Sequence, residues 1–207
     1  MLGSINPRAL PNRADGTLEL AQVEAAINAD DPHFARTRLL ALENTIGGRP
    51  IGRDYLEQAL ALARRRGLAT HLDGARIFNA AVHFGTSVKA LCAGFDSVSS
   101  CLSKGLGAPA GTLLVGRREF IARARRARKI LGGAMRQAGV LAAAGLYALE
   151  HNVLVLPGAR MRLVTHLDVD AAGIERAVSA FSEFSSGDAG APGGIRIHDP
   201  WLRRPIL

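Results

Sequence analysis

Apolar residues along this chain recur with two different spacings, and the two spacings alternate. Apolar positions three or four residues apart predict helices over residues 18–28, 55–65, 77–82 and 87–92. Short apolar runs of strand length occupy residues 38–42, 69–72, 96–102 and 111–115. The order strand, helix, strand, helix, strand predicts an α/β fold with a mostly parallel sheet, whose functional groups gather at the strand ends.

The pattern changes after residue 116. Two long helices are predicted over residues 117–130 and 135–151. The apolar stretch 138–149 is much shorter than the roughly 20 residues of a membrane-spanning helix, so we interpret it as a buried helix. A short connection at 153–158, a strand at 161–166 and a helix at 171–184 are predicted next. The tail at 185–207 is rich in Gly, Pro and Ser and is expected to lack fixed structure.

Composition fits a protein with a substantial core. The chain has 207 residues, of which 48% are hydrophobic, enough for one domain or one and a small part. The first sixteen residues show neither an apolar signal core nor an amphipathic presequence, so we expect a cytoplasmic protein without a membrane partner. Cys92 and Cys101 have no metal-binding or redox spacing, which favours reduced core thiols and no metal site.

The net charge of +8 is concentrated in a few places. Residues 117–129 hold six arginines and one lysine against one glutamate, and residues 64–66 are three consecutive arginines. On a helix, the solvent side would carry Arg118, Arg125, Arg128 and Lys129, and the inward side Phe120, Ile121 and Ile130. No aromatic residues alternate with these charges as a platform for single-stranded nucleic acid would require. A solvated basic face is therefore favoured over nucleic-acid binding, which stays an alternative.

Two stretches carry candidate chemistry. The sequence HLDGAR places His71, Asp73 and Arg76 at the end of one predicted strand, and Lys104 lies in a glycine-rich turn after a later strand. A lysine amine can condense with an aldehyde, and an aspartate can hold a pyridine nitrogen protonated. Together these residue types suit an anchor for pyridoxal phosphate at Lys104, with Gly105 and Gly107 letting the backbone approach the ring.

Each of these residues also has a simpler interpretation. An aspartate followed by glycine at a strand end is commonly just a turn, which would explain Asp73. Arg76 could form a surface ion pair. Lys104 could be a solvated turn lysine. His71 is better explained as a hydrogen-bonded core histidine than as a catalytic group.

Several segments, in the same order, closely resemble threonine aldolase, a pyridoxal-phosphate enzyme of the aspartate-aminotransferase fold (fold type I). They are PNRADGTLELAQVEAAI, HFARTRLLALENT, HLDGARIFNAAV, DSVSSCLSKGLGAPAGTLLVG, RRARKILGGAMRQAGVLAAAGLYALEHNV and RMRLVTHLDV. The resemblance covers residues from about 7 to 184. It implies a partial large, cofactor-binding domain over 1–152, a remnant of the small C-terminal domain over 153–184 and a tail over 185–207.

The resemblance implies a role for each matching residue. Lys104 would carry pyridoxal phosphate, Asp73 would pair with its pyridine nitrogen, and Arg76 would bind its ring hydroxyl. Substrate contacts would come from Arg162 to the carboxylate, His33 near the hydroxyl, and Lys129 and Arg136, the last two across a subunit interface of a homo-oligomer. The implied reaction cleaves a β-hydroxy-α-amino acid to glycine and an aldehyde.

The resemblance also shows differences. The family's phosphate-binding glycine/threonine segment and a ring-stacking histidine come before the segment that matches residue 1, and most of a small domain is replaced by residues 154–159. A truncated, internally deleted threonine aldolase is therefore expected. Three hypotheses follow: a working aldolase subunit, an inactive remnant of that enzyme, or a basic nucleic-acid-binding module.

Overall fold

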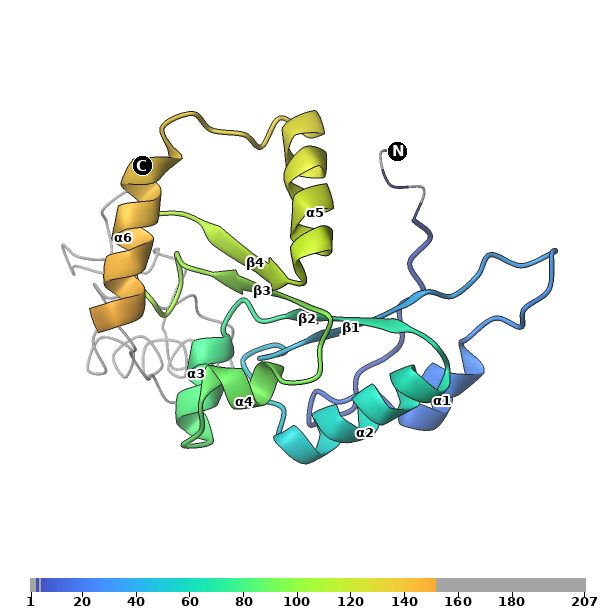
Figure 1. Ribbon diagram of the computed structural model, residues 1–207. Helices are drawn as coiled ribbons and strands as arrows, with labels where there is room; N and C mark the ends of the chain where they lie inside the picture. The colour runs from blue at the N-terminus through green and yellow to red at the C-terminus, as the bar shows by residue number, and fades with distance from the viewer. Residues whose placement is uncertain (1–2, 4, 152–207) are drawn as a thin grey trace, which may run out of the picture.

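The sheet is the organising element of the computed structural model, which describes residue 3 and residues 5–151 (Figure 1). Its four strands lie in the order β1 (Leu39–Glu43), β2 (Ala69–Asp73), β3 (Ser97–Cys101) and β4 (Thr112–Gly116). β1, β2 and β3 are parallel, and β4 runs antiparallel to β3. The predicted mostly parallel sheet is confirmed, each strand to within about one residue at either end.

Four helices lie together on one side of this sheet (Figure 1). They are α1 (Leu20–Ala25), α2 (Arg53–Arg65), α3 (Ile77–His83) and α4 (Val88–Cys92). Local sequence accounts for their ends. Asp54 in the first turn of α2 and Arg64 and Arg65 in the last complement the helix dipole, and the Ser87 hydroxyl caps α4 by accepting from the Ala90 N–H at 3.1 Å.

The core forms where these helices meet the sheet. Alternate strand residues such as Leu40, Leu42 and Leu72 point into it, opposite Leu56 of α2 and Ile77 of α3. The other strand positions point to the opposite face, where Leu39 and Asp73 are exposed. The sheet therefore presents one packed face and one open face within the described residues.

Two longer helices follow the sheet, α5 (Arg118–Ile130) and α6 (Ala138–His151). None of the helices in the described part of the chain is both long and apolar enough to span a membrane. The predictions for 153–158, 161–166, 171–184 and the tail, together with Arg162, lie outside the described residues.

The prediction of a buried helix at 138–149 is wrong. In α6 only Gly145 and Ala148 are buried, while Val140 and Leu146 are 76% and 61% exposed. The fully buried positions of α6 are small residues, Leu149 is partly buried beside them, and other large apolar side chains of α6 are exposed. A helix that is apolar all round does not reveal which side is packed.

Helix α5 bears out only part of its prediction. The four basic residues named for its solvent side are exposed, and the Phe120 ring packs beneath Gly116. Ile130, predicted to turn inward, is instead 68% exposed in the last turn of α5.

Tyr55 of α2 ties the N-terminal segment to the core. Its hydroxyl accepts from the Leu18 N–H at 2.9 Å and donates to the Leu18 carbonyl at 3.1 Å, while burial raises the pKa of this phenol. We expect Tyr55→Phe to lower the free energy of unfolding by about 1–3 kcal/mol, because both backbone groups lose their partner. Urea denaturation would measure this as a lower midpoint at an unchanged slope.

Tyr147 provides the matched control, since it is the other tyrosine of the chain and its side chain is exposed. Tyr147→Phe is expected to leave the urea midpoint unchanged. Equal effects of the two substitutions would contradict the role given to the Tyr55 hydroxyl.

Candidate functional site

Asp73, Arg76 and Lys104 gather at one edge of the sheet. Asp73 is the last residue of β2, Arg76 directly precedes α3, and Lys104 follows the end of β3. Because β2 and β3 are parallel neighbours, their carboxyl ends meet at the same edge, with Asp73 opposite Ser99. Ligands of open α/β sheets bind outside this edge, so the structure assembles the predicted residues where a site is expected.

The turn after Asp73 lies tightly on β3. The Gly74 N–H donates to the Ser99 carbonyl at 2.7 Å, and a Cβ on Gly74 would lie 2.9 Å from that same oxygen. Only glycine allows this approach. The turn thereby fixes the backbone that carries Asp73 and Arg76.

The Asp73 carboxylate has one bound and one open oxygen. Oδ1 accepts from the Ala75 N–H at 3.1 Å and from the Ser99 hydroxyl at 3.5 Å. Oδ2 has no hydrogen-bond partner within residues 5–151. The side chain is exposed. The turn interpretation and the ligand interpretation of Asp73 are therefore compatible, because each uses a different oxygen.

Arg76 is buried, which makes the surface ion-pair interpretation wrong. The residue is only 8% exposed, and its Nη2 atom has no hydrogen-bond partner among the described residues. Leaving a buried charged donor unpaired costs more free energy than an ordinary hydrogen bond contributes. Such a group requires an explanation, and an acceptor supplied by a ligand is one.

Lys104 lies in a turn packed between α3 and α6. Its carbonyl accepts from the Gly107 N–H at 2.8 Å, and Gly107 needs its positive φ of 69° for this turn. Leu102 and Leu106 on either side of the lysine pack against Ala148 of α6. Lys104 itself is half-buried, so it is not simply a solvated turn lysine.

Gly105 lies close to α3. A Cβ there would lie 2.6 Å from Oδ1 of Asn79. The sequence analysis attributed the small residue to room for a cofactor ring. The Lys104 turn thus approaches α3 closely at this glycine, and room for a cofactor ring stays a prediction.

These groups fit pyridoxal phosphate in chemistry. The open carboxylate oxygen suits a protonated ring nitrogen, and the half-buried amine suits an aldehyde carbon. The buried Nη2 of Arg76, which lacks an acceptor in the described part of the chain, suits a ring oxygen. All three come from adjacent strand ends.

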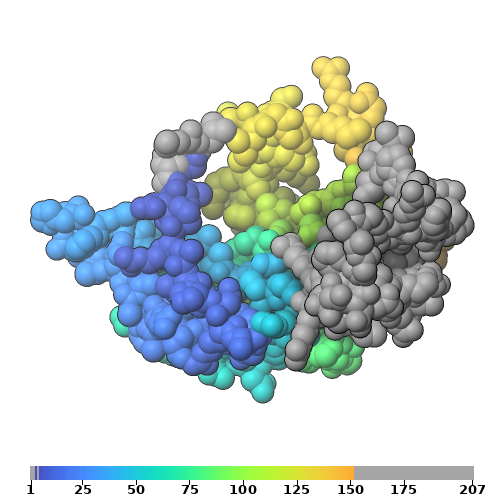
Figure 2. All heavy atoms as spheres, turned by 180° about the vertical axis from the view of Figure 1, so that it is seen from behind, coloured from blue at the N-terminus to red at the C-terminus, as the bar shows by residue number. Residues whose placement is uncertain are grey.

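The remaining predicted residues lie elsewhere. His33 lies on the segment 26–38, which stands out from the body of the molecule in both views (Figures 1 and 2) and leads into the opposite end of the parallel strands. Its side chain is 86% exposed and pairs with Asp31 at 2.7 Å, and hydrogen bonds from His33 lower the pKa of Asp31. Lys129 and Arg136 are exposed at and after the end of α5, and the chain alone does not bring them to Asp73.

Sequence reasoning missed three polar residues near the edge. Ser99 contacts Asp73, Asn79 contacts the Lys104 turn, and the Thr45 hydroxyl after β1 is buried without a partner in the described chain. The strand pattern carried a signal for Ser99, because its position in β3 could have been aligned with Asp73. His71 is hydrogen-bonded, as predicted, but it is half-buried on the open face of the sheet and does not belong to the core.

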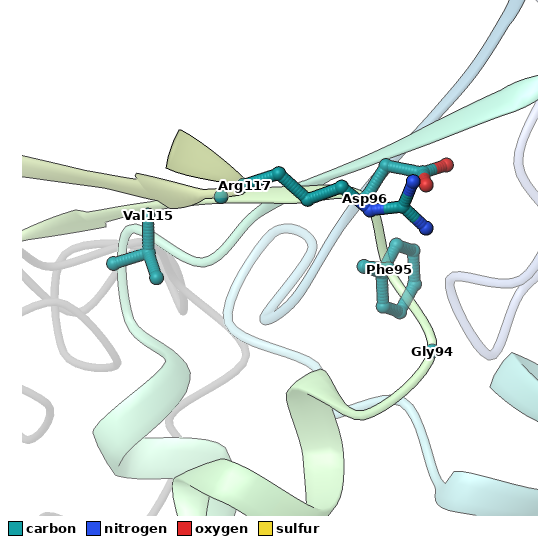
Figure 3. A pocket seen from close by; sticks show the side chains of 6 residues that line it. Gly94, Phe95, Asp96, Val115 and Arg117 are labelled. Carbon is teal, nitrogen blue, oxygen red and sulfur yellow. The ribbon is translucent and has the colours of Figure 1, made fainter. Parts of the chain in front are cut away.

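A shallow pocket lies at the other edge of the sheet (Figure 3). Its lining consists of Gly94, Phe95, Asp96, Val115, Gly116 and Arg117. The Asp96 carboxylate is already used, since Oδ2 accepts from the Thr70 N–H at 2.8 Å and from its hydroxyl at 3.0 Å. Asp96 thus links β2 to the start of β3 through hydrogen bonds. The pocket is separate from the Asp73 edge.

The thiols and the metal-binding side chain types give no second candidate site within the described residues. Both cysteines are unpaired and half-buried, and burial raises the pKa of the Cys92 thiol, which makes it a poor nucleophile. No cluster of histidine, cysteine or carboxylate side chains within the described residues could hold a metal ion.

Known proteins resemble this chain over most of its length. The beta-eliminating lyase family model matches residues 1–168. Low specificity L-threonine aldolase of Escherichia coli K12 is 56% identical over 153 residues, which is 74% of this chain and 46% of that protein. Low-specificity L-threonine aldolase 1 of Arabidopsis thaliana is 46% identical, covering 73% and 44%. The chain thus spans about half the length of these relatives.

Solved structures agree in fold. A protein from Listeria monocytogenes assigned as an L-allo-threonine aldolase has a TM-score of 0.59 and 27% identity, over 73% of this chain and 41% of that one. Threonine aldolase of Leishmania major has a TM-score of 0.60 over 83% and 48%, at 19% identity, and supports the fold alone. The fold expected from the resemblance is confirmed.

Proposed function

Because the chain belongs to the beta-eliminating lyase family, we propose that it is a pyridoxal-phosphate-dependent threonine aldolase polypeptide, which cleaves β-hydroxy-α-amino acids to glycine and an aldehyde. Members of the family depend on pyridoxal phosphate in general. The observation that carries the proposal is the meeting of Asp73, Lys104 and the buried Arg76 at one sheet edge, where Nη2 of Arg76 has no partner among residues 5–151. The proposed substrate is a small amino acid, in keeping with the names of the relatives.

Each residue at this edge has a proposed part. When bound, pyridoxal phosphate would supply an electron sink for the electrons of the breaking Cα–Cβ bond. Lys104 would hold the cofactor through its amine, Asp73 would keep a proton at the ring nitrogen through Oδ2, and Arg76 would donate to the ring hydroxyl. The close fit of Gly74 on β3 supports this assignment, since it fixes two of the three groups relative to the sheet.

Substrate contacts are proposed from the family resemblance. Arg162 would bind the carboxylate and orient the bond to be cleaved, because a guanidinium binds a carboxylate in a bidentate fashion. His33 would take the proton of the β-hydroxyl, and Lys129 and Arg136 would contribute to the site. Since the chain alone leaves His33, Lys129 and Arg136 away from Asp73, we propose that they act in a homo-oligomer located in the cytoplasm.

Titration of the purified chain with pyridoxal phosphate tests the proposal. We expect a new absorbance band from a covalent adduct and, after borohydride reduction, a stable modification on Lys104. The chain has three lysines, at 89, 104 and 129, so mapping is simple. Trypsin does not cleave at a modified lysine, so the adduct would appear on the peptide spanning residues 90–117.

Two results would contradict the proposal. A protein that stays colourless, or one modified equally on all three lysines, would favour the hypothesis of an inactive remnant. The nucleic-acid hypothesis predicts retention on RNA or DNA that weakens steeply with salt. The basic side of α5 is exposed, so it is the surface that this measurement would test.

A further inference from the structure

Four polar side chains line the open face of the sheet in a row that ends at Asp73. The Nδ1 atom of His71 lies 2.8 Å from the Ser97 hydroxyl, and its Nε2 atom lies 3.5 Å from the Ser99 hydroxyl. The Ser99 hydroxyl in turn lies 3.5 Å from Oδ1 of Asp73. The parallel register produces the row, because His71 pairs with Ser97 and Asp73 pairs with Ser99.

The direction of the hydrogen bonds follows from the last member of the row. An ionised carboxylate only accepts, so Ser99 is the donor in the hydrogen bond between its hydroxyl and Asp73. The Ser99 oxygen is then left to accept, which requires a hydrogen on Nε2 of His71. In the neutral imidazole Nδ1 is consequently the acceptor, and Ser97 donates to it. The row therefore has one consistent direction, from Ser97 to Asp73.

We propose that His71 is a positioning residue for the cofactor site, acting on the Asp73 carboxylate through Ser99. This inference rests on the proposed function, because it concerns the residue assigned to the ring nitrogen. Oδ1 is held by Ser99 and by the Ala75 N–H, so rotation of the carboxylate is restricted and Oδ2 keeps its direction. The two 3.5 Å contacts are long, and such bonds commonly shorten when a site is filled.

Three features favour His71 as the residue that fixes Ser99 and, through it, the Asp73 carboxylate. Its imidazole is half-buried against β3 and is held at its far side by the shortest bond of the row, at 2.8 Å. It sits mid-strand, where the sheet hydrogen bonds fix its backbone. Ser99, by contrast, has a small side chain with a freely rotating hydroxyl, which a donor on Nε2 would orient.

Two conservative replacements of His71 distinguish the contributions of its two ring nitrogens. Glutamine places an amide nitrogen at the position of Nε2 and can still donate to Ser99. Asparagine reaches only the position of Nδ1 and can still bind Ser97. We expect His71→Asn to weaken pyridoxal phosphate binding about five- to tenfold, because the hydrogen bond to Ser99 is lost next to the charged Asp73. The affinity of His71→Gln should remain within about twofold of that of the unsubstituted chain.

The double substitution tests whether His71 acts through Ser99. Ser99→Ala alone is expected to weaken binding about tenfold. His71→Asn added to Ser99→Ala should then cause no further loss, because the link to Asp73 is already broken. Equal loss in the Gln and Asn variants, or additive losses in the double variant, would overturn the proposal. His83→Gln, at an exposed histidine of α3, is the control and should bind normally.

A second measurement needs no cofactor. At about pH 8, where imidazole is neutral, nitrogen NMR of the unsubstituted chain should show His71 with its hydrogen on Nε2 alone. In Ser99→Ala the same ring should change its signals while His83 does not. Two interconverting tautomers in the unsubstituted chain would overturn the inference. A chain that shows the single tautomer yet binds no pyridoxal phosphate would contradict the proposed function and leave the hydrogen-bonded row standing.

Discussion

Replacing Lys104 by alanine is expected to abolish the covalent adduct with pyridoxal phosphate. The chain has only two other lysines, Lys89 and Lys129, and Lys89 lies on the exposed side of α4, outside the Asp73 edge. Loss of the amine removes the bond to the aldehyde carbon, so we expect both the absorbance band and the borohydride-stable mass on peptide 90–117 to disappear. This substitution has the largest expected effect, because it removes the group that forms the covalent bond and the signal is lost completely.

Two further variants show which property of Lys104 matters. Lys104→Arg keeps the positive charge without a nucleophilic amine, and we expect it also to give no adduct. Lys89→Ala is the control and should retain the full signal, with unchanged stability because that side chain is exposed. An adduct that survives in Lys104→Ala would place the reactive amine elsewhere and remove the basis of the proposed function.

The strands and the sheet class could be predicted from the sequence for physical reasons, and so could the placement of Asp73, Arg76 and Lys104 at one edge. Strand-length apolar runs ending in charge locate the edge of a parallel sheet, and Asp, Arg and Lys at that edge limit the chemistry. Asp73 and Lys104 were identifiable because their residue types are unusual next to buried strands. The family resemblance then assigned them separate roles.

Other features depend on tertiary contacts that no local pattern records. The burial of Arg76 and the close approach of Gly105 to Asn79 of α3 appear only in the folded chain. The row from Ser97 to Asp73 requires the β2–β3 register. Helix α6 is apolar on all sides, so composition could not tell which side is packed.

Arg76→Met is expected to separate cofactor binding from stability. Methionine retains the aliphatic bulk of the buried side chain but cannot donate to a ring hydroxyl. We expect the affinity for pyridoxal phosphate to fall about 10- to 100-fold, because a charged hydrogen bond is lost. The free energy of unfolding without cofactor should stay the same or rise by about 1–3 kcal/mol, because a buried guanidinium nitrogen without a partner is removed.

Arg66→Met is the matched control, because Arg66 forms an exposed ion pair with Glu24 at 2.6 Å, away from the Asp73 edge. Its loss should lower the free energy of unfolding by less than about 1 kcal/mol and leave the affinity for pyridoxal phosphate unchanged. Urea denaturation and absorbance titration on both variants give the two quantities side by side. If Arg76→Met instead destabilised the chain by several kcal/mol, the guanidinium would serve the fold, and its unpaired nitrogen would lose its meaning as a ligand contact.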